Sequence, residues 1–266
     1  MKFIHLTDLH LVPPGRKLWG FDSFPRFDHC LADIVKYHGD AEFCAISGDL
    51  TERGEVEAYA ALKERLITFP IPVYLMMGNH DDRINFLNVF SGPSEEGFVQ
   101  HRLIQGGQHF LFLDTLKGVP SSAGLYDEPR RKWLSAALAD AGHAPVYIFM
   151  HHQPFGIHHP LMDLIPLEDG EGFGDLLAGH NVRHIFFGHA HRTISGQWRG
   201  ISYSALPGLN HQLPLTGGSV STIYSEEPAM YSVVHLNGGQ VTVHSDAFMH
   251  RAPAQMAEDA ERGGWS

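Results

Sequence analysis

Five short apolar segments of this 266-residue chain each end in residues that can bind a metal ion. The segments are rich in β-branched and aromatic residues, and the stretches between several of them place apolar residues at helical spacing, which is typical of strands covered by helices. The segments and the polar residues after them are 2–7 with Asp8 and His10, 42–47 with Asp49, 72–77 with Asn79 and His80, 145–150 with His151 and His152, and 182–187 with His189 and His191. Because strands of an α/β sheet direct their carboxyl ends to one crevice, we expect these side chains to meet.

Each motif is weak alone, but their occurrence at five strand ends together favours a metal site. Side chains two residues apart on extended backbone point to the same side, so Asp8 and His10 can bind one ion, and His189 and His191 can face one cleft. Asp49 is the natural bridging ligand because its carboxylate has two oxygens. Mixed carboxylate, imidazole and amide donors suit Fe, Mn, Zn or Co better than Mg or Ca. The absence of ligating cysteine argues against a closed structural zinc site, so we expect an open hydrolytic centre of two metal ions.

The order of predicted elements indicates one α/β domain. Its first half has the order strand, helix, strand, helix, strand. Further strands are predicted over 98–104 and 109–114, turning at Gly106-Gly107, and a helix with Pro129 in its first turn is predicted to be capped by Asp127. After Gly188 only strands are expected, ending in a hairpin at Asn237-Gly238-Gly239.

No linker divides the chain, so we expect a single domain over 1–250, followed by a C-terminal tail over 251–266. Two insertions lie next to the candidate metal ligands. Residues 11–24 are rich in Pro, Gly and aromatic residues, and a segment at about 207–228 is rich in Gly, Ser and Thr. We expect these insertions to form rim loops or a small cap.

Composition argues against several kinds of partner. The formal net charge is -11, and the 19 Lys and Arg residues form no basic cluster, which excludes a surface for long nucleic acid. No apolar run approaches the roughly 20 residues of a membrane span, and the first residues lack the features of a signal peptide. We therefore expect a cytoplasmic protein. The two cysteines, Cys30 and Cys44, lie in apolar stretches and are expected to be buried free thiols.

Taken together, the motifs resemble the signature of the calcineurin-like metallophosphoesterase superfamily. In chain order they are Asp8-x-His10, Gly48-Asp49, Gly78-Asn79-His80-Asp81, His151 and Gly188-His189-x-His191. The stretches 78–81 and 206–211 are similar to the bacterial class III cyclic nucleotide phosphodiesterases and, most closely, to bacterial glycerophosphodiesterases. Residues 17–21 resemble the substrate loop of the latter. The resemblance implies an α/β fold of four layers, α-β-β-α, in which two mixed sheets pack face to face between outer helices.

The same resemblance implies the roles of individual residues. One metal ion is expected to be held by Asp8, His10, Asp49 and His191. The second is expected to be held by Asp49, Asn79, His151 and His189. His80 is expected beside the scissile phosphate as the catalytic proton donor. The expected substrate contacts are His80, His211, His152, Trp19 and Phe21.

These expectations predict a metal-dependent phosphodiesterase in which metal-activated hydroxide attacks phosphorus. Glycerophosphodiesters are the first expected substrates, and cyclic nucleotides are the second. A phosphomonoesterase, a protein phosphatase or a nuclease of the same superfamily and a non-catalytic scaffold are the alternatives. Residues 48–54 also resemble the protein serine/threonine phosphatases, but that family usually has Glu where this chain has Asp81. A scaffold is disfavoured because no expected metal ligand is missing. We also expect a homo-oligomer, because the insertion and the terminal hairpin offer surfaces for self-association.

Overall fold

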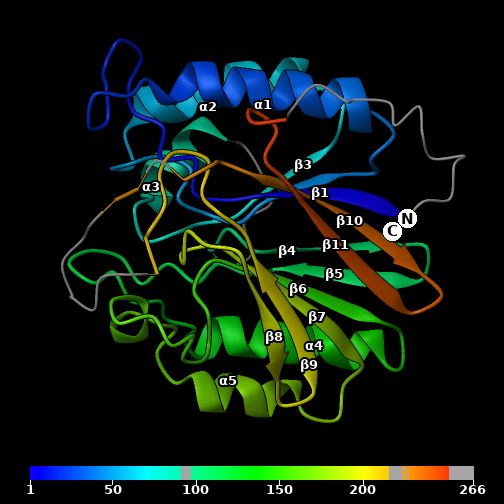
Figure 1. The fold of residues 1–266 in the computed structure, drawn as a ribbon. Helices are drawn as coiled ribbons and strands as arrows, with labels where there is room; N and C mark the ends of the chain where they lie inside the picture. The colour runs from blue at the N-terminus through cyan, green and yellow to red at the C-terminus, as the bar shows by residue number, and fades with distance from the viewer. Residues whose placement is uncertain (91–96, 216–223, 226, 252–266) are drawn as a thin grey trace, which may run out of the picture.

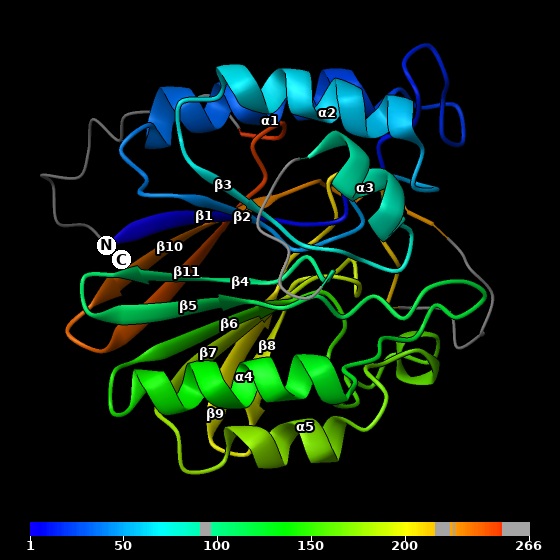
Figure 2. The ribbon, with the colours of Figure 1, turned by 180° about the vertical axis from the view of Figure 1, so that it is seen from behind.

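In the computed structural model, residues 1–90, 97–215, 224–225 and 227–251 are described. Two mixed β-sheets pack face to face, with α1 and α2 outside one sheet and α4 and α5 outside the other (Figures 1 and 2). This arrangement confirms the predicted four-layer α/β sandwich. Among the described residues no helix is both long enough and apolar enough to cross a membrane.

The first sheet has five strands and the second has six. In spatial order the first contains β11 (Gln240–Asp246), β10 (Tyr231–Asn237), β1 (Lys2–Leu6), β2 (Cys44–Ile46) and β3 (Val73–Leu75). The second contains β4 (His101–Gln105), β5 (Gln108–Phe112), β6 (Val146–Met150), β7 (Val182–Phe187), β9 (Ile201–Ala205) and β8 (Ile194–Trp198). The helices are α1 (Ser23–His38), α2 (Val56–Thr68), α3 (Arg83–Val89), α4 (Glu128–Ala141) and α5 (Gly170–Leu177), with a 3-10 turn at Met162–Leu164.

Parallel pairing explains why the candidate ligands converge. Strands β1, β2 and β3 are parallel to one another, as are β6 and β7, while the antiparallel pairs lie toward the sheet edges. The loops that leave the carboxyl ends of both groups are in contact, because the backbone N–H of His189 donates to Asp8 and His151 Nδ1 lies 2.7 Å from the Ser47 carbonyl oxygen.

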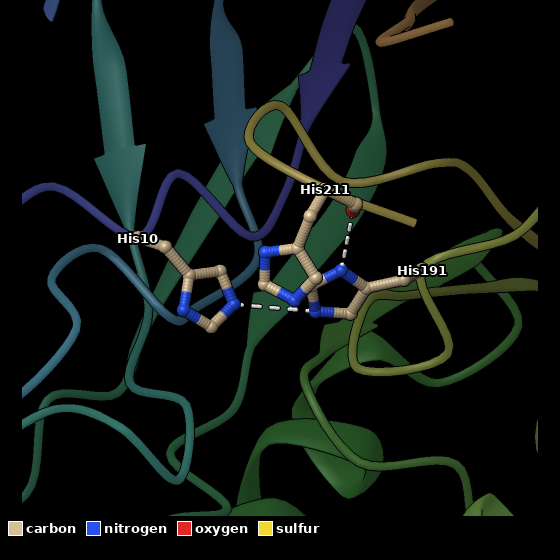
Figure 3. A group of neighbouring side chains, drawn as sticks. All are labelled: His10, His191 and His211. Atoms are coloured by element: carbon tan, nitrogen blue, oxygen red, sulfur yellow. Dashed lines mark hydrogen bonds between the residues drawn. The ribbon is translucent and has the colours of Figure 1, made fainter. Parts of the chain in front are cut away.

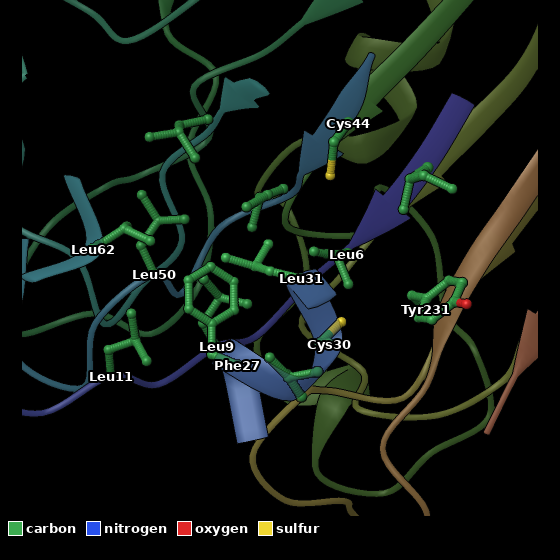
Figure 4. Close-up of a cluster of buried hydrophobic side chains, with 14 of the residues drawn as sticks. Leu6, Leu9, Leu11, Phe27, Cys30, Leu31, Cys44, Leu50, Leu62 and Tyr231 are labelled. Atoms are coloured by element: carbon green, nitrogen blue, oxygen red, sulfur yellow. The ribbon is translucent and has the colours of Figure 1, made fainter. Parts of the chain in front are cut away.

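Three apolar layers hold the sandwich together. An aromatic layer between the sheets includes Phe3 stacked on Phe43, with ring centroids 4.7 Å apart. A second layer lies between the first sheet and its helices and contains Cys30 and Cys44 (Figure 4). Both thiols are free and buried, as predicted. The third layer lies under α4 and α5.

Several local predictions need correction. The strand expected over 98–104 begins only at His101, and the short helix α3 was not expected. The Asp127 side chain occupies the N-cap position of α4 but makes no capping hydrogen bond, because its Oδ1 accepts from Arg130 Nε at 2.7 Å instead. The terminal hairpin is confirmed, with Gly238 and Gly239 at positive φ between β10 and β11. The expected tail beyond Arg251 and part of the 207–228 insertion lie outside the described residues.

Candidate metal centre

The structure brings all seven predicted metal ligands to one edge of the sandwich. Six of them are buried, with at most 5% of the residue surface exposed: Asp8, His10, Asp49, His151, His189 and His191. Asn79 is partly exposed beside them. Four of these side chains form one group, Asp8, His10, Asp49 and His191, whose donor atoms all lie within 4.8 Å of one another.

The distances in the first group match those of a shared ion. His191 Nε2 lies 3.2 Å from Asp8 Oδ1 and 3.2 Å from His10 Nε2, and His10 Nε2 lies 3.5 Å from Asp49 Oδ2. Donor atoms bound at about 2.0–2.2 Å to one ion are separated by about 3.0–3.5 Å. The predicted first ligand set is therefore assembled with suitable spacing.

Asp49 connects this group to the second predicted set. Its Oδ2 atom lies 3.4 Å from His151 Nε2 and 3.5 Å from His10 Nε2. His151 Nε2 is also 3.2 Å from Asn79 Oδ1, and the ring of His189 lies 5.0 Å from that of His151. One carboxylate oxygen thus faces both groups, which is the placement that a bridging ligand requires.

The hydrogen bonds of the imidazoles identify the nitrogens that are left to bind metal. His10 Nδ1 donates to Glu52 Oε2 at 2.7 Å, and His191 Nδ1 donates to the His211 carbonyl at 2.7 Å (Figure 3). With those protons on Nδ1, each ring in its neutral form turns the lone pair of Nε2 toward the other ring, at 3.2 Å, so a positive charge is required between them. Burial opposes the charged form of His191, but Asp8 raises its pKa overall, so a proton can fill this place in the metal-free centre, and a metal ion bound to both Nε2 atoms would replace it.

The second set is oriented in the same way. His151 Nδ1 donates to the Ser47 carbonyl at 2.7 Å, which leaves Nε2 for metal. His189 Nε2 donates to the Ile165 carbonyl at 3.0 Å, which leaves Nδ1. These acceptors could not be read from the sequence, because three of the four histidines are held by main-chain oxygens.

Left-handed backbone also shapes the centre. Five predicted ligands have positive φ: Asp8, His10, Asp49, His189 and His191, with values between 44° and 64°. Such residues are strained and concentrate at functional sites. The Asp49 loop also lies against Gly78, where an added Cβ would come within 2.1 Å of Asp49 Oδ1. The close approach of these two loops therefore requires glycine.

The buried charges perturb one another strongly. Burial lowers the pKa of His151, but the Asp49 carboxylate more than offsets this effect and raises the pKa to about 9. Burial, with the charge of His151, lowers the pKa of His189 to about 3. Burial also opposes the charged form of His80, yet Asp49 and Glu52 raise its pKa overall.

A cavity of about 240 Å³ opens beside the ligands. Its aromatic wall is formed by Trp19 and Tyr224, whose rings stack with centroids 3.9 Å apart, and His211 meets both edge-on. The lining also includes four apolar side chains, Leu161, Met162, Ile165 and Leu213. Sequence reasoning missed these four and Tyr224, because no local pattern distinguishes them from other apolar loop residues.

The predicted substrate residues do not all reach the cavity. His80, His211 and Trp19 line it. Phe21 is 42% exposed but is not among the lining residues. His152 is fully buried beside His189 and does not line the cavity, with Nδ1 2.8 Å from Thr115 Oγ1.

Comparisons with known proteins agree with this geometry. The family model for calcineurin-like phosphoesterases matches residues 1–193. The chain is 35% identical to a probable cyclic nucleotide phosphodiesterase from Rhodopseudomonas palustris, over 98% of this chain and 97% of the relative. It is 28% identical to a glycerophosphodiester phosphodiesterase from Enterobacter lignolyticus, over 95% and 93%. A dimetal phosphatase from Danio rerio shares the fold, with a TM-score of 0.71 at 14% identity over 92% of this chain and 95% of that one.

Proposed function

The chain belongs to the calcineurin-like phosphoesterase family, and on that premise we propose that it hydrolyses small phosphodiesters at a centre of two divalent metal ions. The observation that carries the proposal is the placement of Asp49 Oδ2, which lies within 3.5 Å of imidazole nitrogens from two ligand groups. A cavity for a small substrate adjoins both groups.

In this proposal one ion is held by Asp8, His10, Asp49 and His191, and the other by Asp49, Asn79, His151 and His189. We propose Fe, Mn, Zn or Co as the metals, because the donors mix imidazole with oxygen ligands. When bound, the two ions lower the pKa of water and neutralise the phosphate oxygens, which assists attack on phosphorus.

Two features of His80 support a role as proton donor to the leaving group. Its Nδ1 is engaged with the Glu52 carbonyl oxygen at 3.0 Å, so Nε2 is the nitrogen available to a substrate. The side chain lines the cavity and is 37% exposed. We assign it the role of protonating the departing alkoxide.

The cavity walls favour a diester over a monoester. Among the described residues that line it there is no Lys or Arg. Apart from the proposed metal ions and a protonated His80, no cation of the described walls would meet the second negative charge of a phosphomonoester, whereas a diester carries one charge. Glycerophosphodiesters and cyclic nucleotides both present one such phosphate with a small ester group, and we propose both as substrates.

We further propose that the protein acts in the cytoplasm as a homo-oligomer. The terminal hairpin of β10 and β11 offers an edge strand of the first sheet for self-association. Light scattering coupled to gel filtration would test the oligomer, with a monomer contradicting it.

Hydrolysis of bis(p-nitrophenyl) phosphate and of p-nitrophenyl phosphate by the metal-loaded protein tests the proposed activity. We expect faster cleavage of the diester, and Asp49→Ala serves as the inactive control. Preferential cleavage of the monoester would support the phosphomonoesterase alternative, and hydrolysis of neither would support a scaffold. Glycerophosphoethanolamine and cyclic AMP then compare the two substrate classes directly.

A further inference from the structure

The carboxylate of Asp81 follows the ligand Asn79 closely in the chain but belongs to neither metal group. It is 8% exposed and accepts five hydrogen bonds. Oδ2 accepts from the backbone N–H of Leu50 at 3.1 Å and of Gly78 at 2.9 Å. Oδ1 accepts from the backbone N–H of Thr51 at 3.1 Å, from its hydroxyl at 3.3 Å and from the Tyr59 hydroxyl at 2.9 Å.

These partners lie next to two metal ligands. Leu50 and Thr51 follow Asp49, the bridging carboxylate, and Gly78 precedes Asn79. The two loops leave different strands, β2 and β3, and Asp81 joins their main chains through three N–H groups. They also touch directly, since the backbone N–H of His80 donates to Asp49 Oδ1 at 2.9 Å.

We propose that Asp81 is a positioning residue that holds Asn79 against Asp49 and thereby sets the affinity of the second metal site. The inference rests on the proposed function, because that function supplies the two ligand sets. The other ligands of the first site, Asp8, His10 and His191, lie on loops after β1 and β7, which the clamp does not touch. Loss of the clamp therefore weakens the second site more than the first.

The substitution Asp81→Asn tests the clamp with almost no change of volume. If the new NH2 group takes the place of Oδ1, the hydroxyls of Thr51 and Tyr59 can rotate to accept from it. The backbone N–H of Thr51 then faces a donor. If the NH2 group replaces Oδ2, the N–H groups of Leu50 and Gly78 both face a donor. Either orientation leaves a buried N–H without its acceptor, which displaces a ligand-bearing loop.

Asp33→Asn is a matched control. Asp33 is also 8% exposed and accepts a tyrosine hydroxyl, that of Tyr231, at 2.7 Å. It lies on α1 and is bound by Arg251, away from the metal loops. The control therefore changes a carboxylate of equal exposure that also accepts from a tyrosine, without touching the proposed clamp.

The experiment titrates the metal-free, full-length proteins with Co²⁺, following visible absorption and counting bound ions by equilibrium dialysis and elemental analysis. For Asp81→Asn we expect a 10–100-fold weaker second site, on the scale of other residues that orient metal ligands, and a first site within threefold of the parent. Asp33→Asn should leave both affinities within threefold. Thermal unfolding of the metal-free proteins shows whether each variant is folded.

Equal weakening of both sites in Asp81→Asn, no weakening, or the same loss in Asp33→Asn would overturn the proposal. If Asp81→Asn does not fold, Tyr59→Phe removes one donor and keeps the carboxylate. It should weaken only the second site, about threefold, and unchanged affinities would then overturn the proposal. Co²⁺ binding needs no substrate, so a parent that binds two ions and cleaves no diester contradicts the proposed function and not the role of Asp81.

Discussion

His80→Ala should slow the hydrolysis of natural diesters far more than that of an activated diester. His80 lines the cavity with Nδ1 3.0 Å from the Glu52 carbonyl oxygen, which leaves Nε2 for the leaving oxygen. A glycerol alkoxide is a poor leaving group and needs a proton, whereas p-nitrophenolate, with a conjugate acid pKa of about 7, leaves readily without one.

The size of the effect follows from the role assigned to the side chain. General acid catalysis contributes about 10²–10⁴-fold, so His80→Ala should lower kcat for glycerophosphoethanolamine by about that factor. The loss on bis(p-nitrophenyl) phosphate should stay below about tenfold. Metal content should not change, because the His80 side chain belongs to neither proposed ligand set and only its backbone N–H meets Asp49.

The assay compares kcat and KM on both substrates at saturating metal, with bound ions counted by elemental analysis. His143→Ala is the control, since His143 is an exposed histidine outside the cavity lining. Equal losses on the two substrates would refute proton donation by His80. They would point instead to a role in positioning the phosphate or Asn79.

Three further results are expected. Asp49→Ala should lose hydrolysis and the paired ions, while Asp8→Ala mainly empties one site; an active Asp49→Ala protein with two ions by elemental analysis would disprove the bridge. The Asn79 site should be the weaker one because its amide is a neutral donor, so chelator dialysis should leave partly occupied protein that gains activity with Mn, Co or Zn, and full double occupancy after dialysis would contradict this ranking. Burial lowers the pKa of three histidines, to about 3 or about 4: His5, His101 and His184. Below pH 6.5 the unfolded chain protonates these rings and the folded chain does not. The three histidines should therefore lower the free energy of unfolding by about 4 kcal/mol when the pH is lowered from 7.5 to 5.5. NMR titration of the three rings in metal-free protein tests this, because His151 and His80, whose pKa values are raised, contribute with the opposite sign to the total unfolding free energy. A ring that titrates near pH 6.5 would show that it is not buried as a neutral group.

The ligand types and their convergence were predictable because they depend on short-range pattern and on sheet topology. Each ligand follows an apolar strand, and parallel strands bring their carboxyl ends together. The alternation of strands and helices predicted an α/β domain, whereas the four layers of the sandwich were implied by the resemblance to the family. Tertiary contacts decided the rest: Asn85 of α3 donates from Nδ2 to the Gly54 carbonyl at 2.9 Å, and Tyr224 stacks on Trp19, about 200 residues earlier in the chain.

The orientation of the ligands could not be predicted for a different reason. Three of the four imidazoles donate to main-chain carbonyls, of Ser47, Ile165 and His211, and a carbonyl is present at every position whatever its side chain. Which carbonyl serves is set by loop paths that include left-handed backbone at five ligands. The same dependence on main chain explains why Asp81 matters in our proposal. A centre oriented by loop backbone needs a group that fixes the loops to each other, and a buried carboxylate that accepts from three main-chain N–H groups on two ligand loops can do so.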